Sequence, residues 1–530
     1  MTYWCNNCKI PIHSSSCPLC KTISKQVVGN QISPVFYHER KLLSLILQNN
    51  ITESSVWSIG GAYYMVDGER MYIPYTQFLK EKKYKSMFDS FYEKDEMKTE
   101  FSGMDKLLKA NTDYIQERVF EAEQYIKQTY ESHSSQCVPV VSFSGGKDST
   151  VISSLVQNAL QRKDILHFMA DTTLEFPFTY KYCNDVFKET NPFTPLLVST
   201  PASDFFTICE ELGPPSRRER WCCSIFKTGN LNNLIQNLPE GMGSLTFTGI
   251  RRNESTARKN YPRTRIQSKI SRQIVAMPII EWTELDVWLY ILANRLNFND
   301  AYKLGYRRVG CWCCPNNSRW SDLLTAIYLP EHYKKWRGVL HSFAIKTKKD
   351  DIEDYIENGR WRSRFGSSGL VGRNTEIKDV ECFSTEMARN IISNISIQDD
   401  FLELIKPFGR LVVENIGDIY KVEIYEKNRL TGIIEFKYGS KIIKVTVGKG
   451  NDYLTFLKRI KCQLRKYQYC IQCGACSALC SQSAINIKIG AYQIDSDKCI
   501  HCKECIAHYY NGCITTEVLS DRKGEAVHEL

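Results

Sequence analysis

Residues 138–160 read VPVVSFSGGKDSTVISSLVQNAL, and this stretch decides the fold of the largest part of the chain. Val138 to Phe143 is an apolar, β-branched run of the kind found in buried parallel strands. From Thr150 to Leu160 the apolar residues recur at helical spacing. Between them, Gly145 and Gly146 allow a tight turn and a close approach of the backbone to a ligand. The order of strand, glycine turn and helix predicts an α/β fold with a doubly wound parallel sheet.

The turn also predicts a phosphate site, with an ordinary strand-to-helix turn as the alternative. Unpaired N–H groups at the positive end of the helix form an anion cradle together with nearby hydroxyls. Lys147 adds a mobile cation, and Asp148 can hold a magnesium ion that bridges phosphates. The stretch is not a Walker motif, because only Ser144 precedes the glycine pair. The predicted nucleotide-binding residues here are Ser144, Gly145, Gly146, Lys147, Asp148, Ser149 and Thr150.

Composition describes an ordinary globular protein of several domains. The 530 residues are too many for one core, so roughly three to four domains are expected. No apolar run approaches the ~20 residues of a membrane helix, and MTYWCNNCKI lacks the apolar region of a signal peptide. We therefore expect a cytoplasmic protein with no membrane partner. The formal charge of +10 is weak evidence for nucleic acid, because bound metal thiolates would lower it to about +2.

Cysteine usage predicts metal sites. In a reducing cytosol, 22 cysteines are better explained as metal ligands than as disulfides. Sixteen of them form four groups with ligand spacing: Cys5/Cys8/Cys17/Cys20, Cys222/Cys223/Cys311/Cys314, Cys470/Cys473/Cys476/Cys480 and Cys499/Cys502/Cys505/Cys513. The others are Cys137, Cys183, Cys209, Cys313, Cys382 and Cys462.

Two domains are expected before the glycine turn. Residues 1–25 carry two C-x2-C pairs, which predicts a zinc ribbon with a structural zinc on Cys5, Cys8, Cys17 and Cys20, iron being the alternative. His13 lies between the pairs and is not expected to be a ligand. Residues 26–130 are expected to form an α+β scaffold. In it, Tyr63 to Ile73 predicts a hairpin that turns at Asp67-Gly68.

Charged residues follow two further predicted strands. Asp171 ends the strand that begins at Ile165, which places it to meet the ribose or adenine side of a nucleotide, with a helix cap as the alternative. A loop with Arg217, Arg218 and Arg220 suits phosphate or sulfate. A later strand ends in Gly249 and a set of arginines suited to anions, with a solvated face as the alternative: Arg251, Arg252 and Arg258.

Several segments resemble one enzyme superfamily. SGGKDS resembles the PP-loop of the ATP pyrophosphatases, which include adenylating sulfurtransferases and phosphoadenosine phosphosulfate (PAPS) reductases. The segments DTTLEFPFTYKY, TFTGIRRNESTAR and PIIEWTELDVWLY resemble PAPS reductase segments in the same order. The resemblance implies a catalytic PP-loop domain at residues 131–345, of the adenine nucleotide alpha hydrolase-like fold. It also implies that Lys147, Asp148, Arg251 and Arg252 are catalytic, with Arg258 binding the nucleotide.

The resemblance extends to a cluster but not to the nucleophile. Cys222-Cys223 with Cys311 and Cys314 is similar to the CC…C-x-x-C signature of bacterial sulfonucleotide reductases and implies a [4Fe–4S] cluster. Cys313 is an alternative ligand or a reactive thiol. The mobile E-C-G-x-H segment of those reductases is not found in this sequence. Cys382 shares only Glu-Cys with it, and is either a substitute nucleophile or a buried small side chain.

The chain continues with two segments of less specific composition. Residues 346–405 are expected to be a helical, basic linker region. Its aromatic residues among arginines suit nucleic acid, although a solvated face explains them equally well. Residues 406–462 alternate as short strands and predict a small β domain, which is either a PUA-like RNA-binding barrel or a spacer.

Residues 463–530 resemble a bacterial two-cluster ferredoxin. In that family the fourth cysteine of each run ligates the other cluster. One [4Fe–4S] cluster is thus expected on Cys470, Cys473, Cys476 and Cys513. The other is expected on Cys499, Cys502, Cys505 and Cys480. Ser481 replaces the usual proline after Cys480, and the last spacing is long.

The parts together predict sulfur chemistry that uses an adenine nucleotide. Our first hypothesis is an ATP-dependent sulfurtransferase acting on nucleic acid, as in DNA phosphorothioation or tRNA thiolation. A cysteine desulfurase and an external electron donor would be its partners. An alternative is a PAPS or APS reductase that produces sulfite. A third is a non-catalytic, redox-sensing module that binds nucleic acid. The missing E-C-G-x-H segment favours the first hypothesis, and the ordered reductase motifs favour the second.

Overall fold

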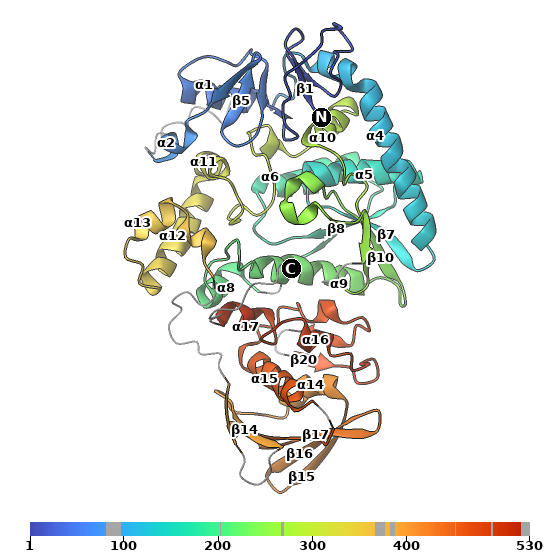
Figure 1. The fold of residues 1–530 in the computed structure, drawn as a ribbon, viewed down its shortest axis with the longest axis vertical. Coiled ribbons are helices and arrows are strands. Elements are labelled where there is room, and N and C mark those ends of the chain that lie inside the picture. The colour runs from blue at the N-terminus through green and yellow to red at the C-terminus, as the bar shows by residue number, and fades with distance from the viewer. Residues whose placement is uncertain are drawn as a thin grey trace. The chain divides into compact units, whose positions relative to one another are not determined.

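The computed structural model describes residues 1–80, 97–201, 203–266, 270–365, 377–381, 387–450, 452–488 and 491–520. The chain divides into two compact units, each described here by itself (Figure 1). The first unit comprises Met1–Ser199, Asn237–Gln267 and Arg272–Gly338. The second comprises Thr200–Gln236, Ser268–Ser271 and Val339–Leu530. The predicted domain at 131–345 thus contributes Thr200–Gln236, Ser268–Ser271 and residues 339–345 to the second unit.

A six-stranded sheet forms the centre of the first unit, in the order β11-β12-β10-β7-β8-β9. Its strands are β7 (Cys137–Ser142), β8 (Leu166–Ala170), β9 (Leu196–Ser199), β10 (Gly243–Phe247), β11 (Thr264–Ile266) and β12 (Gln273–Ala276). Every pairing is parallel except that of β11 with β12. The chain runs from β7 outward to β9 and then returns to β10 on the other side of β7. This confirms the predicted α/β class with a mostly parallel sheet.

Helices pack together beside this sheet. The long α4 (Met104–His133), α5 (Lys147–Leu160) and α10 (Glu284–Ala293) contact one another. The apolar spacing seen in the sequence explains α5, since Val151, Ile152, Leu155 and Val156 are fully buried. The central strand β7 is buried through Val140 and Val141. Further helices are α6 (Pro177–Lys181), α7 (Lys188–Thr190), α11 (Arg319–Tyr328) and α12 (Pro330–Lys346).

The sheet contains a buried, neutral histidine with a predictable effect on acid stability. His167 in β8 is fully buried; its Nδ1 lies 2.9 Å from the carbonyl oxygen of Ile165 and its Nε2 lies 2.8 Å from Ser153 Oγ. Burial lowers the pKa of His167 to about 4. The unfolded chain titrates near 6.5, so between these values it binds a proton that the folded chain does not. Stability is therefore lost as the pH falls from about 6.5 to 4, by about 3 kcal/mol in total.

Urea unfolding at pH 7 and at pH 4.5 measures this effect. The His167→Gln variant is expected to lose less unfolding free energy between the two pH values than the wild type does. An equal loss in both proteins would show that His167 does not carry the effect.

The N-terminal part of the first unit contains two small sheets. One pairs β1 (Tyr3–Cys5) with β2 (Ile10–Ile12). The other has four antiparallel strands, β3 (Ser33–Pro34), β4 (Val56–Ser58), β5 (Tyr63–Val66) and β6 (Glu69–Tyr72), beside α1 (Tyr37–Leu47) and α2 (Tyr75–Lys80). The predicted hairpin is confirmed, because β5 pairs with β6 through Asp67 and Gly68, both with positive φ.

The second unit contains a six-stranded antiparallel sheet in the order β13-β14-β18-β17-β16-β15. Its strands are β13 (Lys378–Glu381), β14 (Ala388–Ile392), β15 (Arg410–Ile416), β16 (Ile419–Glu426), β17 (Arg429–Lys437) and β18 (Ile442–Val447). The first two lie inside residues 346–405, which we expected to be a helical linker. That expectation is corrected for these strands. The exposed β13, KDVE, has no apolar pattern and is held by pairing with β14.

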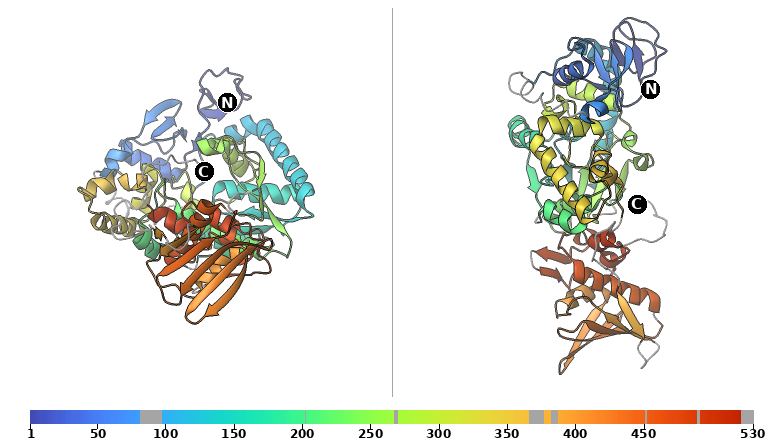
Figure 2. Two further views of the ribbon diagram at one scale, coloured as in Figure 1. Left: turned by 60° about the horizontal axis from the view of Figure 1, so that its bottom comes forward. Right: turned by 90° about the vertical axis from the view of Figure 1, so that its left-hand side faces the viewer.

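Helices cover one face of this antiparallel sheet. Figure 2 shows the red-orange helices against the orange sheet. They are α14 (Phe401–Ile405) and α15 (Tyr453–Tyr469), whose apolar residues share one core with the strands. The chain then forms β19 (Ile485–Lys488), β20 (Ala491–Ile494), α16 (Glu504–Ala507) and α17 (Ile514–Leu519).

A segment from the middle of the chain completes the second unit. It comprises α8 (Phe205–Leu212), the π-helical turn Cys223–Gly229 and α9 (Asn230–Gln236), with α13 (Ile352–Glu357) also in this unit. In Figure 1 the green α8 lies next to the red α17, and the two helices contact each other. No helix in the described parts of either unit is both long and apolar enough to span a bilayer.

Candidate functional site

The predicted phosphate turn lies where the winding of the parallel sheet reverses. From β7 the chain proceeds to β8 on one side and later to β10 on the other. In open α/β sheets, the carboxyl ends of such strands flank the ligand crevice. The turn at residues 143–146 follows β7, and residues 248–251 follow β10. Both predicted anion-binding segments therefore lie at this reversal point.

The PP-loop turn is held by close packing and hydrogen bonds. Gly145 has φ +67, and a Cβ there would lie 2.8 Å from Cys183 Sγ. The Lys147 N–H donates to Tyr302 Oη at 3.0 Å. The hydroxyl of Ser149 donates to the carbonyl oxygen of Gly146 at 2.8 Å. Sequence reasoning did not identify Tyr302 because it lies 155 residues from Lys147.

Four charged side chains meet beside this turn, and we call them the charge quartet: Lys147, Asp148, Arg251 and Glu284. Asp148 accepts hydrogen bonds from Lys147 Nζ at 3.0 Å and from Arg251 Nε at 2.7 Å. Glu284 accepts from Arg251 Nη2 at 2.8 Å, and its Oε1 lies 3.4 Å from Lys147 Nζ. Both cations are only 4% exposed. Two buried positive charges are thus balanced by two carboxylates.

Electrostatics keep the charge quartet ionised. Burial alone would lower the pKa of Lys147, but Asp148 and Glu284 outweigh it and the pKa is raised. The pKa of Arg251 is raised in the same way. Burial would raise the pKa of Asp148, but Lys147 and Arg251 hold it below its usual range. All three groups are therefore charged at neutral pH.

The other predicted nucleotide-binding residues have partners of their own. Arg252 Nε lies 2.5 Å from Glu281 Oε1, and its Nη1 donates to the carbonyl oxygens of Lys259 and Tyr261 at 2.7 Å. Arg258 pairs with Glu254. Asp171 accepts hydrogen bonds from the Thr173 N–H at 2.8 Å and from Tyr180 Oη at 2.7 Å.

Because Gly249 has no side chain, the segment after β10 can lie in close contact with the start of α5. A Cβ at this position would lie 2.8 Å from the backbone carbon and the Cβ of Asp148. The Gly249→Ala variant must therefore displace the start of α5, with an expected loss of about 1–3 kcal/mol of unfolding free energy and weaker nucleotide binding.

Thermal unfolding and nucleotide titration measure both effects. Gly338→Ala in α12 is the matched control, because its Cβ would meet nothing within 4 Å. Wild-type behaviour of Gly249→Ala in both assays would contradict the close contact.

The N-terminal cysteines form a compact set. The ligand atoms of Cys5, Cys8, Cys17 and Cys20 all lie within 4.8 Å of one another. Cys5 Sγ is 3.5 Å from Cys20 Sγ, and Cys8 Sγ is 3.8 Å from Cys17 Sγ. Zn–S bonds of about 2.3 Å in a tetrahedron place sulfurs about 3.8 Å apart. The set fits one tetrahedral metal ion.

His13 links the segment with the four N-terminal cysteines to α10, the helix that begins with Glu284 of the charge quartet. His13 Nε2 lies 2.9 Å from Asp286 Oδ1, and both side chains are buried. The ring of His13 stacks on Tyr114 with centroids 3.7 Å apart. Asp286 also accepts from the Thr283 N–H at 2.8 Å, which caps the helix α10 that begins at Glu284. The ribbon therefore docks on the helical turn that carries Glu284.

The cysteines expected to hold a cluster in the catalytic domain are divided between the units. Cys311 and Cys314 belong to the first unit, where Cys311 Sγ lies 3.3 Å from Thr172 Oγ1. The Trp312 N–H donates to the carbonyl oxygen of Leu174 at 2.9 Å. Cys311 thus lies beside the segment that follows β8. Cys313 is buried, and Cys382 is outside the described residues.

Cys222 and Cys223 belong to the second unit and lie in a basic environment. Arg220 Nη2 donates to Cys223 Sγ at 3.4 Å. The Cys222 side chain lowers the pKa of Cys223 well below its usual range, and Arg220 and Lys227 add to this against burial. Such surroundings favour the thiolate, the form that binds metals. The N–H of Arg217 in the same loop donates to the carbonyl oxygen of Arg362 at 2.8 Å, and Arg218 lies over the ring of Phe365.

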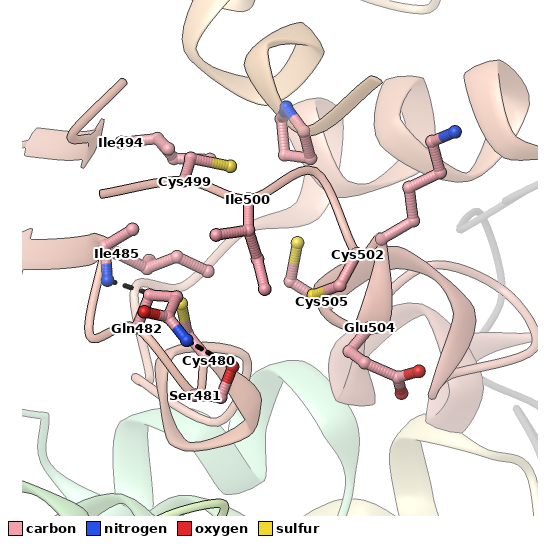
Figure 3. Close-up of a pocket in the computed structure, with 13 residues that line it drawn as sticks. Cys480, Ser481, Gln482, Ile485, Ile494, Cys499, Ile500, Cys502, Glu504 and Cys505 are labelled. Atoms are coloured by element: carbon pink, nitrogen blue, oxygen red, sulfur yellow. Dashed lines mark hydrogen bonds between the residues drawn. The ribbon is translucent and has the colours of Figure 1, made fainter. Parts of the chain in front are cut away.

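The eight C-terminal cysteines fall into two groups. Cys480 lines one small cavity with Cys499, Cys502 and Cys505. Figure 3 shows these four side chains around the cavity together with Ile485, Ile494 and Ile500. The other group consists of Cys470, Cys473, Cys476 and Cys513. Burial raises the pKa of the Cys473 thiol, and the other three cysteines raise it further.

Comparisons with known proteins concern the middle of the chain. Residues 138–317 match the family model of the phosphoadenosine phosphosulfate reductase domain. An uncharacterized protein of Methanocaldococcus jannaschii is 34% identical over 258 residues, which cover 49% of this chain and 52% of that protein. This chain thus spans about half the length of that relative.

Two further matches are more distant. The adenosine 5'-phosphosulfate reductase of Oceanobacillus iheyensis is 28% identical, over 36% of this chain and 77% of that enzyme. The crystal structure of phosphoadenylyl-sulfate reductase from Candida auris is 18% identical with a TM-score of 0.30, covering 41% of this chain and 98% of that one. The segment that matches this family model, residues 138–317, is therefore the one that carries the glycine turn at the sheet's reversal point.

Proposed function

We propose that this protein is a magnesium-dependent, ATP-cleaving sulfurtransferase that uses iron–sulfur clusters and acts on a nucleic acid. The observation that carries the proposal is the charge quartet. It presents two carboxylates, Asp148 and Glu284, at the turn where phosphates are expected to bind. Carboxylates repel a metal-free sulfonucleotide but are the oxygen ligands that Mg²⁺ uses to hold a polyphosphate. An ATP complex of magnesium therefore fits this chemistry better than PAPS does.

Each member of the quartet then has a role in phosphoryl chemistry. Asp148 and Glu284 would hold the magnesium ion. Lys147 and Arg251, released from those carboxylates, would bind the phosphate oxygens and stabilise the negative charge of departing pyrophosphate. In the first step, an acceptor oxygen attacks the α-phosphorus of ATP, and the bond to pyrophosphate breaks. In the second, a sulfur nucleophile takes the place of the adenylate on the acceptor, and AMP leaves.

The cysteine groups are assigned to metals in this proposal. Cys5, Cys8, Cys17 and Cys20 would hold a structural zinc, supported by the sulfur distances. The two C-terminal groups would hold [4Fe–4S] clusters, and the shared cavity of Cys480, Cys499, Cys502 and Cys505 supports one of them. A third cluster on Cys222, Cys223, Cys311 and Cys314 rests on the sequence signature alone. When bound, such clusters supply single electrons.

The acceptor and the other partners are the remaining parts of the proposal. The exposed lysines of α12, which are Lys334, Lys335 and Lys346, suit a DNA or tRNA backbone, as does Lys348 just after the helix. Not all of the basic residues are available, since Arg362 and Arg364 are buried. A cysteine desulfurase would supply the sulfur, and an external donor would supply electrons.

Reduction of a sulfonucleotide is the second candidate. A relative favours it, since the matched enzyme of Oceanobacillus iheyensis is an adenosine 5'-phosphosulfate reductase. In that case Arg251 would bind the sulfate, and sulfite would be the product.

An anaerobic assay of the reconstituted full chain separates the two. ATP with Mg²⁺ and an oligonucleotide acceptor should give pyrophosphate, whereas PAPS or APS with a reductant should give no sulfite. Sulfite formation without pyrophosphate release would replace our proposal by the reductase. Lys147→Met should abolish turnover in either case, so an unaffected variant would remove both enzymes.

A further inference from the structure

The buried lysine of α15 differs from its neighbours in having no carboxylate partner. Lys466 is 1% exposed. Its Nζ donates to Tyr492 Oη at 2.9 Å and lies 4.7 Å from the centroid of the same ring. Other lysines of this unit pair with carboxylates, such as Lys461 with Asp379 and Lys503 with Glu426, both at 2.7 Å. Within the described parts of the chain, Lys466 makes no such ion pair.

An ammonium group buried in this way requires a counter-charge. Removing an unpaired charge from water costs several kcal/mol or more, so buried charges are paired or coordinate metals. A phenol hydroxyl and a ring face provide only dipoles. The missing negative charge must therefore come from groups that become anionic in the assembled protein.

The C-terminal cysteines are close to this ammonium through the packing of α15. Cys476 Sγ lies 3.7 Å from Tyr492 Oη, so the hydroxyl is shared by Cys476 and Lys466. Cys505, of the other group, lies in α16, a helix that packs on α15, and it is buried in the same core as Cys476. Lys466 thus shares a partner with a cysteine of one group and lies on the helix against which a cysteine-bearing helix of the other group packs.

We propose that Lys466 is the shared counter-ion of the two C-terminal [4Fe–4S] clusters and raises the reduction potential of both. The inference rests on the cluster assignment in the proposed function. Reduction adds an electron to each cluster, and a fixed positive charge in a dry site stabilises the added negative charge. Because Lys466 lies on the helix that contacts elements of both groups, we expect the two clusters to respond together to one substitution.

The test is a redox titration followed by electron paramagnetic resonance on the reconstituted full chain. All proteins carry Cys222→Ser so that only the C-terminal clusters are titrated. In Lys466→Met, we expect the equilibrium constant for reduction of each cluster to fall about tenfold, which corresponds to about 59 mV for one electron. Lys466→Arg keeps the charge and should stay near the wild-type potential. Lys458→Met, on the exposed face of the same helix, is the matched control and should not shift either potential.

Each outcome decides the question. If both clusters are present in Lys466→Met and their reduction potentials are unchanged, the role of Lys466 is overturned, but the cluster assignment is not. A shift in Lys458→Met of the same size would also overturn it. If Lys466→Met loses iron while Lys466→Arg retains it, the counter-ion role is supported; equal loss in both variants contradicts it. Absence of [4Fe–4S] clusters in the wild type removes both the inference and the cluster assignment.

Discussion

The Glu284→Gln variant is expected to release pyrophosphate from ATP about 100-fold more slowly than the wild type, a loss typical of removing one electrostatic group from an active site. Glutamine keeps the shape of the side chain that contacts Arg251 and Lys147. It removes one of the two negative charges of the quartet. A magnesium ion then loses a carboxylate ligand.

The same change should strengthen the binding of metal-free ATP. With Glu284 neutral, the two cations face only Asp148, and the site becomes net positive. Titration of ATP with and without Mg²⁺ therefore separates two effects of opposite sign: tighter binding without the metal and slower turnover with it.

Glu281→Gln provides the control for charge and location. Glu281 lies three residues before Glu284, is half exposed and pairs with Arg252 outside the quartet. We expect wild-type turnover and magnesium dependence from it. If the two variants behave alike, or if Glu284→Gln keeps its magnesium dependence, the carboxylate pair is not the metal site.

The Asp286→Ala variant is expected to lose about 1–3 kcal/mol of unfolding free energy, the cost of leaving buried hydrogen-bonding groups without their partner. Asp286 is fully buried, and it pairs with His13 at 2.9 Å. Burial would raise its pKa, but His13 and the Thr283 groups hold the pKa below its usual range, so the folded state carries the anion. Alanine removes both the ion pair and the helix cap.

Zinc retention and nucleotide affinity should fall together in this variant. The ribbon docks through His13, and α10 begins at Glu284, two residues before Asp286. Urea unfolding, zinc release to a chromogenic chelator and ATP titration measure the three effects. Asp164→Ala, at an exposed pair with Arg162 in the same unit, is the control and should cost far less. A normal zinc affinity in Asp286→Ala would show that the two sites are independent.

Local patterns in the sequence predicted the elements whose residues are consecutive. The run VPVVSF and the spacing in Val151 to Leu160 were sufficient for β7 and α5, because strand and helix periodicity are local properties. Asp67-Gly68 predicted the β5–β6 turn for the same reason. The C-x2-C pairs predicted a compact cysteine set, since each pair is one tight turn.

Long-range partners could not be predicted in this way. Glu284 is 33 residues from Arg251 in the chain. The two side chains meet only because α10 begins beside the carboxyl edge of the parallel sheet, where Arg251 follows β10. In the segment PIIEWTELDVWLY, the tryptophans Trp282 and Trp288 are buried. Its acidic residues gave no separate signal. A useful signal would have been that two acidic residues, Glu284 and Asp286, start a helix that is otherwise apolar.

The strands β13 and β14 illustrate the same limit. Residues 378–381 are exposed and three of the four are charged, and their conformation comes from pairing with β14. In turn β14 pairs with β18, 58 residues later in the Ala388–Thr446 register. No property of the segment itself distinguishes such an edge strand from a linker.

Gly229 restricts how far the C-terminal segment can be treated as a separable module. A side chain at this position would begin 3.0 Å from the carbonyl oxygen of Cys473, and Asn232 Nδ2 lies 3.5 Å from Ser477 Oγ. The loop that carries Cys473 therefore packs closely against the turn that follows Cys222 and Cys223. If residues 463–520 were moved onto another protein, this loop would lose the surface that it packs against. The eight-cysteine segment and the Cys222–Gln236 segment should therefore be moved together.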